Sequence, residues 1–163
     1  REHRRTGPVV LESPVEGIDT LALQLVGDRD QFIPGRRRLE PMLLEDVAVP
    51  LPALAALVSG VAKIAAERDL PIPVIAHAGD GNTHPLIVFD PADADMARRA
   101  ELAFGEIMDL AIGLGGTITG EHGVGRLKRP WLAGQIGPDA MALNQRIKRA
   151  LDPDNILNPG AAI

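Results

Sequence analysis

The sequence has no cysteine, few aromatic residues and no long apolar run, and each absence excludes a class of protein. Without cysteine there can be no disulfide framework, no zinc ribbon and no cysteine nucleophile. Aromatic residues make up 2% of the chain, so a core has to be built from aliphatic side chains and methionine. No stretch is apolar over the length that a bilayer requires, and we therefore expect no transmembrane helix.

The charge and the start of the chain exclude further classes. The formal net charge is −5 and the basic clusters are short, which argues against a nucleic-acid partner. The first residues are charged and do not form a secretory signal, and the chain begins with Arg1 rather than methionine, which suggests a trimmed or truncated chain. We expect a cytoplasmic protein, either free or peripheral at the inner face of the membrane.

The 163 residues, 45% of them hydrophobic, are sufficient for one domain with a core. Residues 1–35 show little periodicity, so we expect an irregular, partly disordered segment with one strand at 20–26. The pattern after this segment predicts strands at 42–49, 74–76 and 86–89 and helices at 52–68, 93–114 and 139–151. Strands, helices and an antiparallel hairpin together indicate the α+β class. The last helix is expected to bury Ala140, Leu143, Ile147 and Ala150.

The predicted hairpin carries two histidines, in the segment 77–84 (HAGDGNTH). If the turn is symmetric about Asp80 and Gly81, His77 and His84 lie directly opposite each other and face the same side. Two imidazoles so placed can bind one divalent ion. The alternative is that one histidine packs and the other is solvated. Asp80 could accept a hydrogen bond from a histidine, although a role in the turn is favoured.

A second cluster follows at 120–125 (GEHGVG), where three glycines indicate an unusual backbone path or a close approach to another group. Glu121 could complete a set of two histidines and one carboxylate, which suits zinc, manganese or ferrous iron. His122 would then remain as a general base. A phosphate-binding loop and a purely structural glycine turn remain alternatives. Arg126 and Lys128 could hold a carboxylate, with an exposed face as the default expectation.

Three motifs in this order resemble a known family. They are 77–86 (HAGDGNTHPL), 115–125 (GGTITGEHGVG) with Lys128 just after it, and 152–160 (DPDNILNPG). Together with 45–50 (EDVAVP) they resemble the C-terminal domain of FAD-linked oxidases of the vanillyl-alcohol-oxidase type. Among its members the likeness is to the glycolate oxidase flavin subunit and FAD-dependent D-lactate dehydrogenases. We accordingly expect residues 36–163 to form that domain.

The resemblance implies a ferredoxin-like cap domain, in which helices pack on an antiparallel sheet and a C-terminal helical segment follows. It also implies that a separate domain or chain binds most of the FAD, so that this chain is an incomplete fragment. A hydride would pass from a small D-2-hydroxy acid to the flavin while His122 takes the hydroxyl proton. The implied metal ligands are His77, His84 and Glu121, and the implied cofactor-binding residues are Asn158, Gly120 and Gly123.

The substrate is expected to be small. Hydroxyglutarate-type members carry a basic residue just before the aspartate of the opening strand, whereas Leu43, Leu44 and Glu45 stand here. This difference favours glycolate or D-lactate over a long dicarboxylate. Two other functions remain open from the residues alone: a metal-dependent hydrolase that uses the same histidines and glutamate, and a non-catalytic metal-binding module. The electron acceptor stays undetermined.

Overall fold

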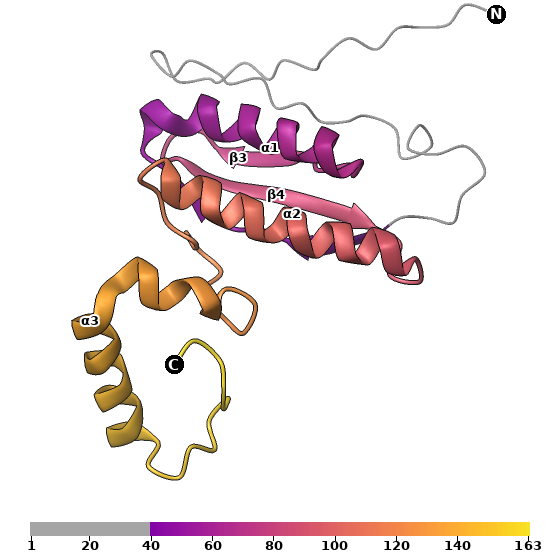
Figure 1. The fold of residues 1–163 in the computed structure, drawn as a ribbon. Helices are drawn as coiled ribbons and strands as arrows, with labels where there is room; N and C mark the ends of the chain where they lie inside the picture. The colour runs from indigo at the N-terminus through magenta and orange to yellow at the C-terminus, as the bar shows by residue number, and fades with distance from the viewer. Residues whose placement is uncertain (1–39) are drawn as a thin grey trace, which may run out of the picture.

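The computed structural model describes residues 40–163, shown in colour in Figure 1. The predicted strand at 20–26 and the boundary near residue 36 lie outside the described residues. In chain order the elements are β1 (Glu40–Leu44), β2 (Val47–Ala48), a 3₁₀ turn (Leu51–Ala53), α1 (Leu54–Arg68), β3 (Val74–His77), β4 (Asn82–Phe89), α2 (Ala94–Gly113) and α3 (Arg129–Leu151). Of these helices, none is long and apolar enough to cross a membrane.

Strand β4 is the centre of a small antiparallel sheet. It pairs with β1 and β2 along one edge and with β3 along the other. A single antiparallel bridge between Ala48 and Thr117 extends the sheet beyond β2. The order is therefore that of a ferredoxin-like unit whose last strand is reduced to one residue pair. The predicted α+β class, an antiparallel sheet with helices packed on it, is confirmed.

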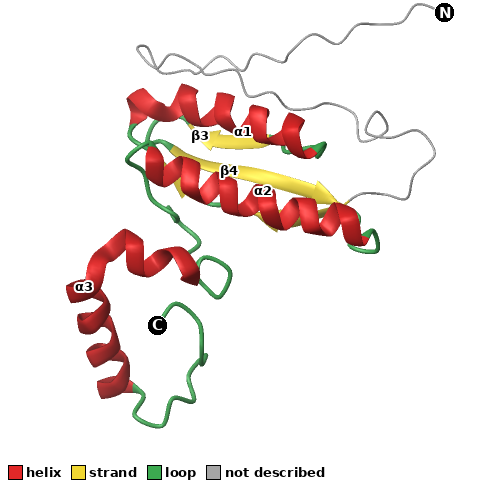
Figure 2. Ribbon diagram, viewed as in Figure 1, coloured by secondary structure: helices red, strands yellow, loops and turns green. Residues whose placement is uncertain are grey.

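Helices α1 and α2 run side by side and cover one face of the sheet (Figure 2). They do so because each carries an apolar stripe at helical spacing. Asp93 caps the start of α2 by accepting hydrogen bonds from the backbone N–H groups of Asp95 and Met96. The helix residues buried in this core are Leu54, Leu57, Val61, Ile64, Met96, Ala100, Ala103, Phe104, Ile107, Met108 and Ala111.

The last helix differs from its prediction in length. It begins at Arg129 rather than near residue 139, and it bends where Gly137 adopts φ 77° and ψ 171° before Pro138. Glycine tolerates this backbone conformation, and proline cannot donate the next helical hydrogen bond. Ahead of the bend, Leu132 is buried and the Trp131 ring packs on the Phe104 ring at 5.9 Å between centroids.

Beyond the bend, the predicted burial is wrong. Leu143 is 52% exposed and Ile147 is 48% exposed, Ala150 is exposed, and Ala140 is only half-buried. In Figure 1 this half of α3 points away from the sheet and the C-terminal tail curls beside it. Helical periodicity identifies an apolar face, but it does not say whether anything in the same chain covers that face. We call α3 beyond Gly137 together with residues 152–163 the C-terminal arm.

Candidate functional site

The two histidines of the hairpin lie on one face of the sheet, but not in the predicted register. His77 pairs with Asn82, and His84 pairs with Ile75. The predicted direct opposition of His77 and His84 is therefore wrong by two residues, because β4 begins at Asn82 and the turn is centred one residue earlier. A shift of two residues keeps each side chain on its face. The rings are consequently diagonal neighbours, with centroids 5.3 Å apart.

Glu121 reaches both histidines from the loop after α2. Its Oε1 lies 3.5 Å from Nε2 of His77, and its Oε2 lies 3.7 Å from Nε2 of His84. One potential ligand atom from each of the three residues lies within 4.8 Å of the others. Two ligands about 2.1 Å from one tetrahedral ion would be about 3.4 Å apart, so the donor set fits a divalent metal ion with little rearrangement.

His84 is oriented by the neighbouring strand. Its side chain is buried, and its Nδ1 lies 3.2 Å from the backbone carbonyl oxygen of Glu45. A carbonyl oxygen can only accept, so this contact places the proton of the neutral ring on Nδ1. Nε2 is then free to bind a metal ion. A metal-binding histidine usually donates its other ring N–H to a carbonyl or carboxylate oxygen, as Nδ1 does here.

The His122 ring lies next to His84. The two rings stack with centroids 5.0 Å apart and 17° between their planes. His122 is exposed, whereas His84 is buried. The loop 120–122 thus brings a carboxylate to the two histidines and leaves an imidazole at the solvent-accessible side of the same group.

Asp46 contacts the loop that carries Glu121 and His122, and sequence reasoning had assigned it no role. Its buried carboxylate accepts hydrogen bonds from the Thr119 hydroxyl (2.7 Å) and from the backbone N–H groups of Gly120, Glu121 and His122 (3.0, 3.0 and 2.7 Å). Burial alone would raise the pKa of Asp46, but these hydrogen bonds outweigh it and hold the pKa well below its usual range. The only local signal was a pair of acidic residues inside an apolar strand.

Lys128 lies behind Asp46 rather than on an exposed face. Its ammonium group is buried and donates to the backbone carbonyl of Asp46 at 2.7 Å. Burial lowers the pKa of Lys128, and the nearby charges of Glu45 and Asp46 oppose this. Burial also raises the pKa of Glu45 to about 8. The predicted exposed face at Lys128 is therefore wrong, because its ammonium group is buried beside Asp46.

The glycines and the turn have structural reasons of their own. A Cβ atom on Gly120 would lie 2.4 Å from Oδ1 of the buried Asn82, so a side chain there would displace that amide. Gly123 has φ 78°, in the region that favours glycine. Asp80 accepts a hydrogen bond from the backbone N–H of Asn82, which is the turn role that the prediction favoured.

The third motif lies on the C-terminal arm. Asp152 accepts hydrogen bonds from the backbone N–H groups of Ile156 and Leu157 at 2.9 and 3.0 Å, and from the Lys148 ammonium group. The Lys148 contact lowers the pKa of Asp152 more than burial raises it. Asn158 follows with φ 46°. In Figure 1 this tail lies beside α3, apart from the hairpin that carries the histidines.

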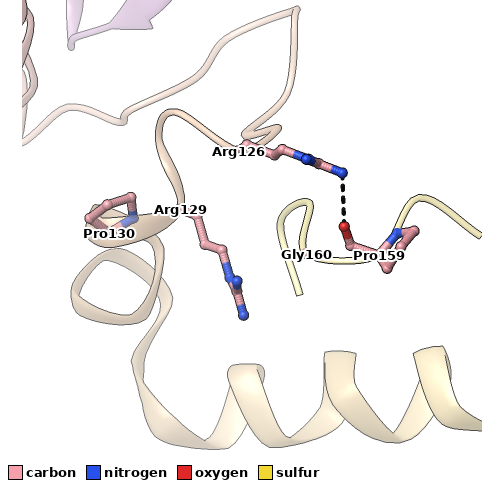
Figure 3. A pocket seen from close by; sticks show the side chains of 5 residues that line it. All are labelled: Arg126, Arg129, Pro130, Pro159 and Gly160. Atoms are coloured by element: carbon pink, nitrogen blue, oxygen red, sulfur yellow. Dashed lines mark hydrogen bonds between the residues drawn. The ribbon is translucent and has the colours of Figure 1, made fainter.

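A hollow of about 450 Å³ lies where the tail meets the start of α3 (Figure 3). Arg126 donates to the carbonyl oxygen of Pro159 at 3.0 Å, and the Arg129 guanidinium extends into the space between helix and tail. Both arginines are exposed. The hollow therefore adds positive charge beside the terminal motif but does not reach the histidines.

Comparison with known proteins identifies similar chains. The family described as "FAD linked oxidases, C-terminal domain" matches residues 19–162. The glycolate oxidase subunit GlcD of Bacillus subtilis (strain 168) is 44% identical over 85% of this chain and 30% of its own length. The same subunit of Escherichia coli (strain K12) is 36% identical over 89% and 31%. The mitochondrial D-lactate dehydrogenase [cytochrome] of Arabidopsis thaliana is 44% identical over 74% and 21%. The chain thus spans less than a third of these relatives.

Proposed function

Because the chain belongs to the C-terminal domain family of FAD-linked oxidases, we propose that it supplies the substrate side of a flavin-dependent oxidoreductase acting on a small D-2-hydroxy acid, either glycolate or D-lactate. The observation that carries the proposal is the convergence of His77, His84 and Glu121, with His122 stacked beside them. They lie on the sheet face opposite α1 and α2, which no helix of residues 40–163 covers. The relatives named above are oxidoreductases of such acids, and none is named as a hydrolase.

His77, His84 and Glu121 hold a divalent ion, whether zinc, manganese or iron, in this proposal. When bound, such an ion would polarise the hydroxyl and carboxylate oxygens of the substrate. The three protein ligands leave coordination positions open, as catalytic metal sites do. His84 is the fixed ligand because it is buried and oriented, whereas His77 and Glu121 are half-exposed and can adjust.

His122 is the general base of the proposed reaction. An imidazole nitrogen of His122 takes the proton of the substrate hydroxyl, and histidine is the side chain most often used for such proton transfer. When bound, FAD would accept the hydride from C2 of the substrate. Stacking on His84 orients the His122 ring toward the same side as the metal ligands.

The surroundings of the site favour a short substrate. Leu44, which pairs with Leu86, is 49% exposed on the uncovered sheet face, and Ile75, which pairs with His84, is 41% exposed. These side chains offer apolar surface and no cation beside His84. A second carboxylate would be poorly solvated there, whereas a hydrogen or a methyl group at C2 would not.

FAD is bound mainly by a domain or chain beyond this one. The open sheet face is expected to turn toward that partner. Gly120 and Gly123 allow the loop to approach the flavin closely because they lack side chains. Asn158 contributes to the cofactor site from the tail that Asp152 holds in place.

The test is turnover by the full-length protein. The protein would be purified with its flavin, supplied with zinc, manganese or ferrous iron, and assayed with glycolate and with D-lactate in the presence of an artificial electron acceptor. Bleaching of the flavin absorbance by either acid supports the proposal. A flavin-loaded, metal-supplied protein that neither acid reduces would reject it.

A further inference from the structure

We propose that Asp46 is the positioning residue of this site, whose carboxylate fixes the backbone that carries both Glu121 and His122. The inference rests on the roles proposed above for those two side chains. It adds a residue that itself touches neither the substrate nor the cofactor. Its effect passes through the loop it holds.

The hydrogen bonds converge on one group. Three consecutive backbone N–H groups, at Gly120, Glu121 and His122, all point at the Asp46 carboxylate, and the Thr119 hydroxyl completes the set. The loop is rich in glycine, so its own sequence does little to restrict its conformation. Its order has to be imposed from outside, and a buried carboxylate that accepts several N–H groups is a strong, directional anchor.

The anchor is itself fixed to the sheet. Asp46 lies between β1 and β2, and the two strands pair with β4 in one register from Leu43 to Ala48, after an irregularity between Pro41 and Leu43. The Lys128 ammonium group holds the Asp46 backbone carbonyl from behind. Oδ1 of Asp46 is 3.9 Å from Nδ1 of His84. His84, on the neighbouring strand, is the proposed metal ligand through its other ring nitrogen. One short stretch of edge strand therefore sets the position of the sheet ligand and of the loop together.

Replacing the carboxylate by an amide tests the anchor with little change in volume. Asp46→Asn leaves one acceptor oxygen and turns an –NH₂ group toward backbone N–H donors, so part of the hydrogen-bonded set is lost. Asp152→Asn is the matched control, because Asp152 holds the tail by the same kind of contacts. It should loosen residues 153–158 and leave the site loop unchanged.

The experiment uses the full-length, flavin-loaded protein and two readouts. Hydrogen exchange of peptides covering 117–125 should rise roughly tenfold in Asp46→Asn, with peptides from α2 unchanged. Calorimetric titration with zinc or manganese should show affinity lowered by about 10- to 100-fold, the size typical for groups that orient metal ligands. Asp152→Asn should change neither readout. Unchanged exchange at 117–125 in Asp46→Asn would overturn the proposal.

A second variant decides the question if Asp46→Asn does not fold. Thr119→Val removes one of the donors without touching the sheet and should raise exchange at 117–125 by a few-fold; no rise would overturn the proposal. Failure of the proposed function is a separate result. A wild-type protein inactive on both acids, or one that binds no divalent ion, rejects the assigned chemistry, while the exchange comparison still decides the role of Asp46.

Discussion

The sheet region and the C-terminal arm of this chain are each organised around a buried aspartate. Asp46 gathers the backbone N–H groups of 120–122, and Asp152 gathers those of Ile156 and Leu157. A lysine lies next to each aspartate, Lys128 in the first case and Lys148 in the second. The local device is the same, so the difference between the two regions lies in what surrounds it.

The sheet region buries its apolar side chains in a core of its own, whereas the arm leaves many of its apolar side chains exposed. Behind Asp46 lies a continuous core in which side chains such as Leu57 and Ile107 are fully buried. On the arm, Leu151, Ile156 and Leu157 are 76%, 74% and 62% exposed. Apolar surface of this kind is normally covered by another part of the protein or by a partner. The comparison teaches that the sheet region has a core of its own, whereas the arm leaves apolar side chains exposed within the described residues.

The largest expected effect removes the proposed base from the sheet region. His122→Asn in the full-length protein should lower kcat by about 10²- to 10⁴-fold, because no group is left to take the hydroxyl proton. Flavin content should stay at the wild-type level, since FAD is proposed to be bound mainly outside this chain. Asn158→Ala on the arm should instead weaken flavin retention. Stopped-flow flavin reduction measures the loss of catalysis, and the absorbance ratio of flavin to protein measures the loss of flavin. An unchanged kcat in His122→Asn would show that His122 is not the general base.

The second prediction compares burial in the two regions. Ile107→Ala, in the core, should lower the free energy of unfolding by about 2–5 kcal/mol. Ile147→Ala, on the arm, should change it by less than about 0.5 kcal/mol in the 163-residue chain. In the full-length protein the cost of Ile147→Ala should rise above that value if a partner covers the arm. Urea unfolding measures all four values, and equal costs of Ile147→Ala in both proteins would mean that the arm stays uncovered.

The third prediction concerns pH and the interior of the sheet region. Burial raises the pKa of Glu45 to about 8, so the folded protein binds a proton that the unfolded chain releases near pH 4.5. The stability that Glu45 contributes is full below pH 4.5 and is lost as the pH rises toward 8, at no more than about 1.4 kcal/mol per pH unit. Glu45→Gln should flatten this slope. Urea titrations at pH 5, 6.5 and 8 check it, and an identical slope in the variant contradicts the assignment.

The smallest expected effects are changes in stability when either of two glycines is replaced by alanine, and the two changes have opposite signs. Gly120→Ala should destabilise the protein by about 1–3 kcal/mol, because the new methyl group meets the buried Asn82 amide. At Gly134, in the first half of α3, a Cβ atom would meet no neighbouring side chain within 4 Å, and Gly134→Ala should stabilise by about 0.5–1 kcal/mol. Thermal unfolding compares the two. A stabilising Gly120→Ala would show that the Asn82 amide moves aside easily.

The elements with regular periodicity could be predicted from the sequence. Helix α2 was predicted at 93–114 from its apolar spacing, and the structure places it at Ala94–Gly113. Helix α3 was predicted only from residue 139, whereas the structure retains helix on both sides of a bend at Gly137 and Pro138, residue types that typically break helices. The hairpin register was missed because the turn was assumed to be centred on Asp80 and Gly81, one residue later than in the structure.

The grouping of the three candidate ligands could be predicted from the sequence, but the residues that support them could not. His77, His84 and Glu121 are distinctive residue types in glycine-rich surroundings, so the pattern indicated them. Asp46 contacts residues 73 to 76 positions later in the chain, and no local pattern reveals such a partner. The buried state of Lys128 was missed for the same reason, because it depends on a strand 82 residues earlier.

The sequence distances within the site also bear on when it forms during folding. His77 and His84 belong to one hairpin, and such local contacts form in microseconds. Glu121 and His122 join them only when residues 75 and 76 positions apart meet at Asp46. Closing that long loop is the slower event. Metal uptake during refolding should therefore report the completion of the domain rather than its first steps.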